Sequence, residues 1–155
     1  MKNGNRCDFF IAIAKIKLES LAEKEISEKL IEYNYDEGDK LSNLASCLQE
    51  KYSGVTNGFL SDVYELLFGV KVEFTGNIAN LYSCPCCGFN TLDEVYDAEL
   101  GLGYDICAIC NWEDDGTKDI DTYSGVNKGT INSYREKMQD NRNYYYREKY
   151  KKNDI

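Results

Sequence analysis

The chain of 155 residues has no histidine, the side chain that serves most often as a general base in enzymes. It also lacks a long apolar run. The most apolar stretch, FFIAIAKIKL at residues 9–18, is interrupted by two lysines and is far shorter than the roughly 20 residues of a membrane-spanning helix. Asp8 precedes that stretch, which does not fit a signal peptide. We therefore expect a soluble, cytoplasmic protein that is not an enzyme.

Basic residues are scarce in the middle of the chain, where residues 81–127 carry ten acidic side chains and only Lys118 as a base. Residues 128–155 have the opposite balance, with eight basic and four acidic side chains. Such acidity disfavours nucleic acid as a partner for the middle segment. It indicates either a solvated face or a docking surface for a basic protein. The residues proposed for partner binding are Glu113, Asp114, Asp115, Asp119 and Asp121.

The first half of the chain has the periodicity of helices. A Ser-x-x-Glu capping box at residues 20–23 predicts one helix, with an apolar stripe of Ala22, Ile26, Leu30 and Tyr33. Asp39 is the expected cap of a second helix, whose apolar face comprises Leu41, Leu44, Ala45, Leu48 and Tyr52. A third helix is predicted from near Asn57 to Gly69, burying Phe59, Leu60, Val63, Tyr64 and Leu67. The alternating VKVEFTG, residues 70–76, predicts a strand.

The sequence changes character at Leu81. LYSCPCCGFNTL and YDICAICNW are strand-like segments, each interrupted by Cys-x-x-Cys, and the glycines of LGLGY predict a turn between them. A final helix is expected from near Thr130, with a stripe of Ile131, Tyr134, Met138 and Tyr145. Its end, NYYYREKYKK, is typical of a surface helix that packs tyrosines on its neighbour, with nucleic-acid binding as the alternative.

Four of the seven cysteines have the spacing of a metal site. One Cys-x-x-Cys pair, Cys84 and Cys87, is separated by 19 residues from a second, Cys107 and Cys110, which fits the four-cysteine zinc pattern. Two residues between ligands allow a tight turn to aim both sulfurs at one ion, and Gly88 supplies backbone freedom after the first pair. Disulfides are the less favoured alternative, because cytosolic thiols stay reduced.

The remaining cysteines are interpreted as structural residues. Cys86 lies between two predicted ligands, so its side chain should point away from the metal. It could be a spare ligand, a reactive thiol or a small buried residue, and the acidic surroundings favour the last. Cys7 and Cys47 are expected in the helical core, and Trp112 is expected to shield the sulfurs from water.

The segments CPCCGFNTLDE, YDICAICNWEDDG and DIDTYSGVNKGTINSYREK resemble the bacterial cysteine-rich CPCC family over about residues 81–139. The family usually has a proline where this chain has Ala108. The resemblance implies a small zinc-ribbon or rubredoxin-like protein without an established enzymatic activity, and some members resemble immunity proteins encoded beside secreted toxins. The predicted fold is α+β. It consists of an N-terminal helical half (1–80) packed with a four-cysteine zinc-ribbon, rubredoxin-like β module (81–127) and a C-terminal helix with a basic tail (128–155).

Three classes of function remain open from the sequence. The first is a non-enzymatic protein-binding module with structural zinc, whose acidic surface neutralises a basic partner such as a toxin domain. The second is a rubredoxin-like electron-transfer module, because four cysteines also suit iron. The third is an enzyme, which is disfavoured because a closed four-sulfur site leaves zinc no open position for water. Asp114 and Asp115 would be its candidate carboxylates.

Overall fold

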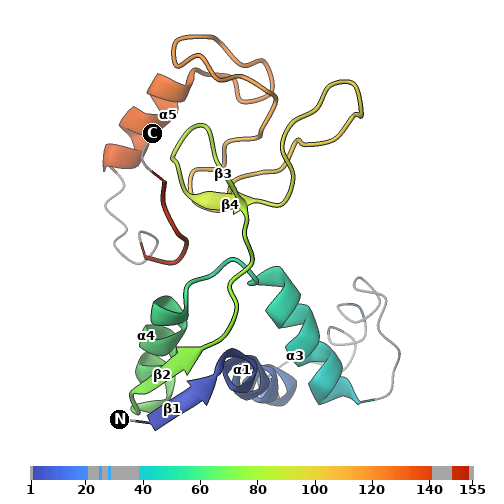
Figure 1. Cartoon of the computed structure of the whole chain (residues 1–155), viewed down its shortest axis with the longest axis vertical. Coiled ribbons are helices and arrows are strands. Elements are labelled where there is room, and N and C mark those ends of the chain that lie inside the picture. Colours follow the sequence, from blue (N-terminus) through green and yellow to red (C-terminus); the bar gives the residue numbers. More distant parts are fainter. Residues whose placement is uncertain (1, 21–24, 26–27, 29–38, 141–147, 154–155) are drawn as a thin grey trace. The chain divides into compact units, whose positions relative to one another are not determined.

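The computed structural model of the chain describes residues 2–20, 25, 28, 39–140 and 148–153 (Figure 1). The chain divides into two compact units, Met1–Ile78 and Ala79–Ile155. The predicted α+β class is confirmed, with N-terminal helices, small sheets, a four-cysteine cluster in the β region and a C-terminal helix. Within the described ranges, no helix combines the length and apolar character needed to cross a membrane.

In the residues that the structure describes, the first unit combines three helices with a two-stranded parallel sheet. Its elements are β1 (Lys2–Asn5), α1 (Arg6–Ser20), α3 (Lys40–Lys51), α4 (Asn57–Phe68) and β2 (Val72–Thr75). β1 pairs with β2 in a register that places Lys2 opposite Val72 and Asn5 opposite Thr75. Val72 and Phe74 are buried while the residues that follow each are exposed, so the strand predicted from alternation within residues 70–76 is confirmed.

The starts of two helices are set by side chains that cap them. The Asp39 carboxylate accepts hydrogen bonds from the backbone N–H groups of Leu41 (3.1 Å) and Ser42 (3.2 Å), which confirms the predicted cap of α3. The cap of α4 is Thr56, one residue before the predicted start, and its hydroxyl accepts from the N–H of Phe59. Gly69, with φ of 67°, ends α4 as predicted, because glycine adopts this left-handed conformation without steric cost.

The capping box predicted at residues 20–23 lies outside the described residues, apart from Ser20, which is the last residue of α1. Two expectations for the first unit were wrong. Leu67 is 55% exposed, because it lies in a last turn, residues 65–68, that is exposed throughout. Cys7 is exposed, because the neighbouring Arg6 takes the inward position, whereas Cys47 is buried as expected. All four residues of the predicted stripe, Ala22, Ile26, Leu30 and Tyr33, lie outside the described residues. Only Glu25 and Glu28 of this segment are described.

Arg6 is buried at the start of α1 and contacts the chain that connects α3 to α4. Its Nη2 atom donates to the carbonyls of Tyr52 (2.6 Å) and Ser53 (3.0 Å). Its Nη1 atom donates to the carbonyl of Val55 (2.7 Å) and to the Asn57 side-chain oxygen (2.9 Å). Carbonyls at a helix C-terminus lack helical partners and attract cations. Burial lowers the pKa of Arg6, because it disfavours the charged form. The four acceptors bind the guanidinium and thereby link α1 to α3 and α4.

Replacing Arg6 with methionine should destabilise the first unit by about 2–4 kcal/mol, because buried carbonyls would lose their donors. Urea unfolding followed by far-UV circular dichroism measures the loss. Lys15→Met is the matched control, since it removes a charge from an exposed position on the same helix and should change stability little. Equal stability of the two variants would contradict this role for Arg6.

The second unit contains a short antiparallel pair, β3 (Tyr82–Ser83) with β4 (Asn90–Leu92), and the helix α5 (Ile131–Asp140). β3 and β4 flank the first Cys-x-x-Cys. An isolated bridge between Ile106 and Glu113 flanks the second. The prediction of short strand-like segments interrupted by cysteine pairs is therefore confirmed.

α5 begins where predicted and packs inside the second unit. Thr130 and Ser133 cap it reciprocally, since each hydroxyl accepts a hydrogen bond from the other residue's backbone N–H, at 3.1 and 3.0 Å. Tyr134 meets Trp112 edge to face, with ring centroids 5.1 Å apart. Tyr145, predicted on the same stripe, lies outside the described residues.

The C-terminal segment returns to the first cysteine pair. The carbonyl of Lys151 accepts from the N–H of Asn90 (2.8 Å), and the N–H of Asn153 donates to the carbonyl of Gly88 (2.9 Å). Tyr150 is buried. The described part of the basic tail, residues 148–153, therefore pairs its backbone with residues 88–90, with Phe89 opposite Lys152. These residues are not helical, so the expectation that the segment ending at residue 152 is a surface helix was wrong for its described part.

Candidate metal centre

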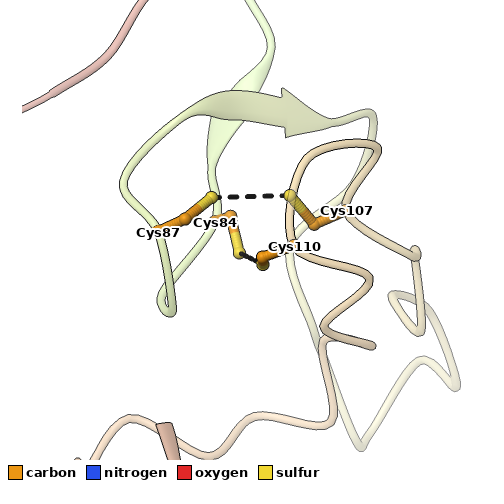
Figure 2. A group of neighbouring side chains, drawn as sticks. All are labelled: Cys84, Cys87, Cys107 and Cys110. Atoms are coloured by element: carbon orange, nitrogen blue, oxygen red, sulfur yellow. Dashed lines mark hydrogen bonds between the residues drawn. The ribbon is translucent and has the colours of Figure 1, made fainter. Parts of the chain in front are cut away.

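The four cysteines singled out by spacing come together in the second unit (Figure 2). Cys84 and Cys87 lie in the turn between β3 and β4, and Cys107 and Cys110 lie in the turn after Ile106. Their Sγ atoms all lie within 4.8 Å of one another, and all four residues are buried. No other group of three or more potential ligand side chains gathers in the part of the chain that the structure describes.

The sulfur separations fit a tetrahedral metal site. Sγ of Cys84 lies 3.7 Å from that of Cys110, and Sγ of Cys87 lies 3.5 Å from that of Cys107. A tetrahedron with metal–sulfur bonds of about 2.3 Å has edges of about 3.8 Å, whereas a disulfide bond measures about 2.05 Å. The four residues therefore form a buried site that could hold one metal ion, and its donor set suits zinc or iron.

Residues 84–89 and 107–112, here called the first and second knuckles, share one backbone pattern. The N–H of each first cysteine donates to the carbonyl five residues later, Cys84 to Phe89 and Cys107 to Trp112, both at 2.9 Å. In return, the carbonyl of each first cysteine accepts from the N–H four residues later, Gly88 or Asn111, again at 2.9 Å. The two halves of the site are thus built by the same turn.

That turn requires a left-handed backbone immediately after the second cysteine. Gly88 has φ of 77° and Asn111 has φ of 58°. Glycine takes this conformation freely, and asparagine is one of the few other residues that adopt it readily. The prediction that Gly88 supplies backbone freedom fits this geometry. Sequence reasoning missed the equivalent role of Asn111, which was visible in the shared order cysteine, glycine or asparagine, aromatic.

Hydrogen bonds distribute the protons of the cluster unequally. Side-chain hydrogen bonds from Cys110, Cys84 and Cys87, with a further one from Thr91, hold the pKa of Cys107 well below its usual value. Hydrogen bonding to Cys107 is the main cause that raises the pKa values of Cys87 and Cys110. A bound metal ion would displace the remaining protons, because metal-bound cysteines are thiolates.

A buried aromatic residue ends each knuckle, and an arginine of α5 binds the first knuckle. Phe89 and Trp112 end the two knuckles and are almost fully buried, which fits the expected shielding by Trp112. Arg135 of α5 donates from Nε to the carbonyl of Cys86 (2.8 Å) and from Nη2 to that of Pro85 (3.3 Å). These bonds tie α5 to the turn of the first knuckle, between Cys84 and Cys87.

The sequence predicts that the Cys86 side chain points away from the metal, and Cys86 does not belong to the group of four sulfurs. A side-chain hydrogen bond with Cys110 lowers the pKa of Cys86 in spite of its burial, and the charge of Arg135 acts in the same direction. Cys86 is fully buried but is not one of the four residues of the tetrahedral group.

A known protein family matches the segment that begins at the Cys-Pro-Cys-Cys motif and continues through the second knuckle into α5. Residues 82–144 match the family described as Cysteine-rich CPCC. The chain carries a cysteine-rich CPCC domain. The resemblance predicted from the sequence is thereby confirmed. No curated protein and no solved structure matches the chain.

The five acidic residues proposed for partner binding do not share one environment in the CPCC domain. Asp114 is buried, and its carboxylate accepts from the backbone N–H groups of Tyr96 (3.0 Å) and Gly116 (3.3 Å). Glu113 is half-buried, and Asp119 and Asp121 are exposed. Asp114 therefore holds the loop together from inside and is not part of an accessible acidic face.

Asp115 also has an internal role. Burial raises its pKa, but hydrogen bonds from the Ser124 hydroxyl (2.7 Å) and from Thr117 outweigh burial, so the pKa lies below its usual value. Ser124 in turn accepts from the backbone and side-chain N–H groups of Asn127, at 3.1 and 2.8 Å. The Asp115 carboxylate thus anchors the loop that leads to α5.

Protein expressed without added metal should contain close to one metal ion per chain by elemental analysis, which also separates zinc from iron. Serine at Cys84, Cys87, Cys107 or Cys110 should lower that content, because a hydroxyl replaces one thiolate ligand. Cys86→Ser is the matched control and should keep the metal. Full occupancy after Cys107→Ser would contradict this ligand set.

Substitution of Asn111 tests the left-handed turn. Asn111→Gly should retain metal affinity, whereas Asn111→Val should cost on the order of 1–3 kcal/mol, since a β-branched residue is strained at this φ. That cost corresponds to a weakening of about 5-fold to 150-fold in competition with a chelator. Ala108→Val, at an exposed position inside the same knuckle, is the control and should bind metal normally. Equal affinities for the two valine variants would refute the requirement.

Proposed function

We propose that the protein is a non-enzymatic protein-binding module, in which one metal ion stabilises the CPCC domain and an acidic surface binds a basic protein. The observation that carries the proposal is the charge separation, with ten acidic residues and one basic residue in residues 81–127. Concentrated charge of one sign repels itself, and a partner of opposite sign relieves that cost.

The enclosure of the metal centre supports a structural role for the ion. All four sulfurs belong to buried residues, and a closed set of four thiolates leaves no coordination position for water or substrate. We propose zinc as the ion, because it is the usual occupant of closed four-cysteine sites. Its binding would contribute to folding, since the cluster joins two knuckles that have little regular secondary structure between them.

The accessible part of the acidic surface near the second knuckle is formed by Glu113, Asp119 and Asp121. Asp119 and Asp121 lie in an exposed turn, where Asp121 accepts a hydrogen bond from Asn132 of α5 at 2.6 Å. A binding site of this kind needs shape and charge but no general base. A toxin domain with a basic surface would be one suitable partner, in which case the protein would act as an immunity protein.

Association with a basic partner should depend strongly on these charges. We expect a partner captured from the host lysate at low salt to associate about tenfold more slowly with the Glu113→Gln, Asp119→Asn, Asp121→Asn variant, and with a flatter dependence on ionic strength. The amide replacements keep the side-chain oxygens that accept the hydrogen bonds of the turn. Stopped-flow or surface-based kinetics measures the rate.

A matched control neutralises three exposed acidic residues of the first unit, Asp62, Glu65 and Glu73. It should associate at nearly the rate of the wild type. Metal content and melting temperature should be the same in all three proteins. An association rate that neither variant changes at any ionic strength would disprove the proposed acidic interface.

A further inference from the structure

Residues 93–106, here called the acidic hairpin, connect the two knuckles of the CPCC domain; they form the yellow loop after β4 in Figure 1. Asp97 and Leu102 pair through two backbone hydrogen bonds of 3.0 and 3.1 Å. The Asp97 carboxylate also accepts from the N–H groups of Glu99 and Leu100, which fixes the tip. Gly101 has φ of 67° and completes the turn.

The base of the acidic hairpin is fixed by carboxylates that accept backbone hydrogen bonds. Asp105 accepts from Asp93 (2.7 Å) and Glu94 (2.9 Å), and Asp114 accepts from Tyr96 (3.0 Å). A side chain at Gly103 would place its Cβ 2.4 Å from the Tyr96 Cα, so the two arms are in direct backbone contact. The hairpin is thus held in one conformation, which lowers the entropic cost of binding.

Apolar side chains of the acidic hairpin are exposed although the hairpin itself is well ordered by these bonds. Leu100 at the tip is 70% exposed and Leu102 is 44% exposed. The other large exposed apolar side chains of the hairpin are Val95, Tyr104 and Ile106. Such a concentration of apolar side chains on a rigid, polar loop is typical of an interaction surface, since apolar groups gain free energy when a partner covers them.

Charge determines what kind of partner can cover this surface. The acidic hairpin carries five carboxylates and no basic residue. Nucleic acids and anionic membranes would be repelled, and a neutral apolar surface would leave carboxylates desolvated without partners. A segment with apolar side chains on one face and lysine or arginine beside them satisfies both sets of groups.

We propose that the acidic hairpin is the docking element of the CPCC domain and that it binds a basic amphipathic segment of a protein partner, with Leu100 and Leu102 as apolar anchors. This inference rests on the proposed function and names the part of the surface that gives affinity. The exposed leucines of α4 in the first unit have fewer acidic neighbours along the chain, since residues 62–73 contain three acidic side chains and one basic side chain.

A synthetic peptide with lysine and leucine at helical spacing is the probe, and fluorescence anisotropy at low salt measures its dissociation constant for the full chain. Leu100→Ser with Leu102→Ser should weaken binding about tenfold or more, because buried apolar anchors contribute most of the affinity of an interface. Leu66→Ser with Val70→Ser is the matched control, since these residues are 69% and 41% exposed and the anchors are 70% and 44% exposed.

A second peptide separates apolar from electrostatic recognition. An oligolysine of equal charge should bind at least tenfold more weakly than the amphipathic peptide and should not distinguish the two double variants. Unchanged metal content and melting temperature of the variants exclude unfolding as the cause of any loss.

Two results would overturn the inference. Equal affinity for both peptides, or equal weakening by the hairpin and control variants, would show that the acidic hairpin supplies no apolar anchor. In that case the proposed function would still stand if neutralising Glu113, Asp119 and Asp121 slowed association with a basic protein. Loss of both effects would remove the acidic interface altogether.

Discussion

The second unit depends on the confinement of four thiol side chains within 4.8 Å of one another. Four thiolates at that separation repel unless protons or a cation neutralise them. Regular structure alone would not hold them there, because β3 and β4 comprise two and three residues. The outer elements attach to the same place, since α5 reaches the first knuckle through Arg135 and the C-terminal segment pairs with residues 88–90.

The fold could be predicted wherever a short stretch of sequence decides the structure. Asp39 caps α3, Gly69 ends α4 and Thr130 begins α5, because each acts on backbone groups within four residues. How deeply each helix is buried could not be predicted in this way. Periodicity puts Leu67 on the same stripe as Leu60, but it does not tell where along the helix the packed neighbour ends.

The metal ligands could be identified from spacing, because a Cys-x-x-Cys turn is a local geometric unit. The side chains that surround these ligands could not be predicted, since their positions depend on contacts between residues far apart in the sequence. Arg135 donates to carbonyls 49 and 50 residues away, and Asp114 turns inward to bind the N–H of Tyr96. The left-handed conformation of Asn111 could in part be predicted, because Asn111 follows a cysteine and precedes an aromatic residue, as Gly88 does. The equivalence became clear only when the two turns were compared.

The acceptors that surround Arg6 are three backbone carbonyls and one amide oxygen, none of which changes its charge when the solution becomes acidic. The thiolates of the other unit behave in the opposite way, because protons compete directly with a cation for sulfur. Acidification would therefore weaken the binding of any metal ion at the four cysteines, while the helices around Arg6 keep their contacts. The metal affinity of the second unit should therefore depend on pH, whereas the hydrogen bonds of Arg6 in the first unit should not.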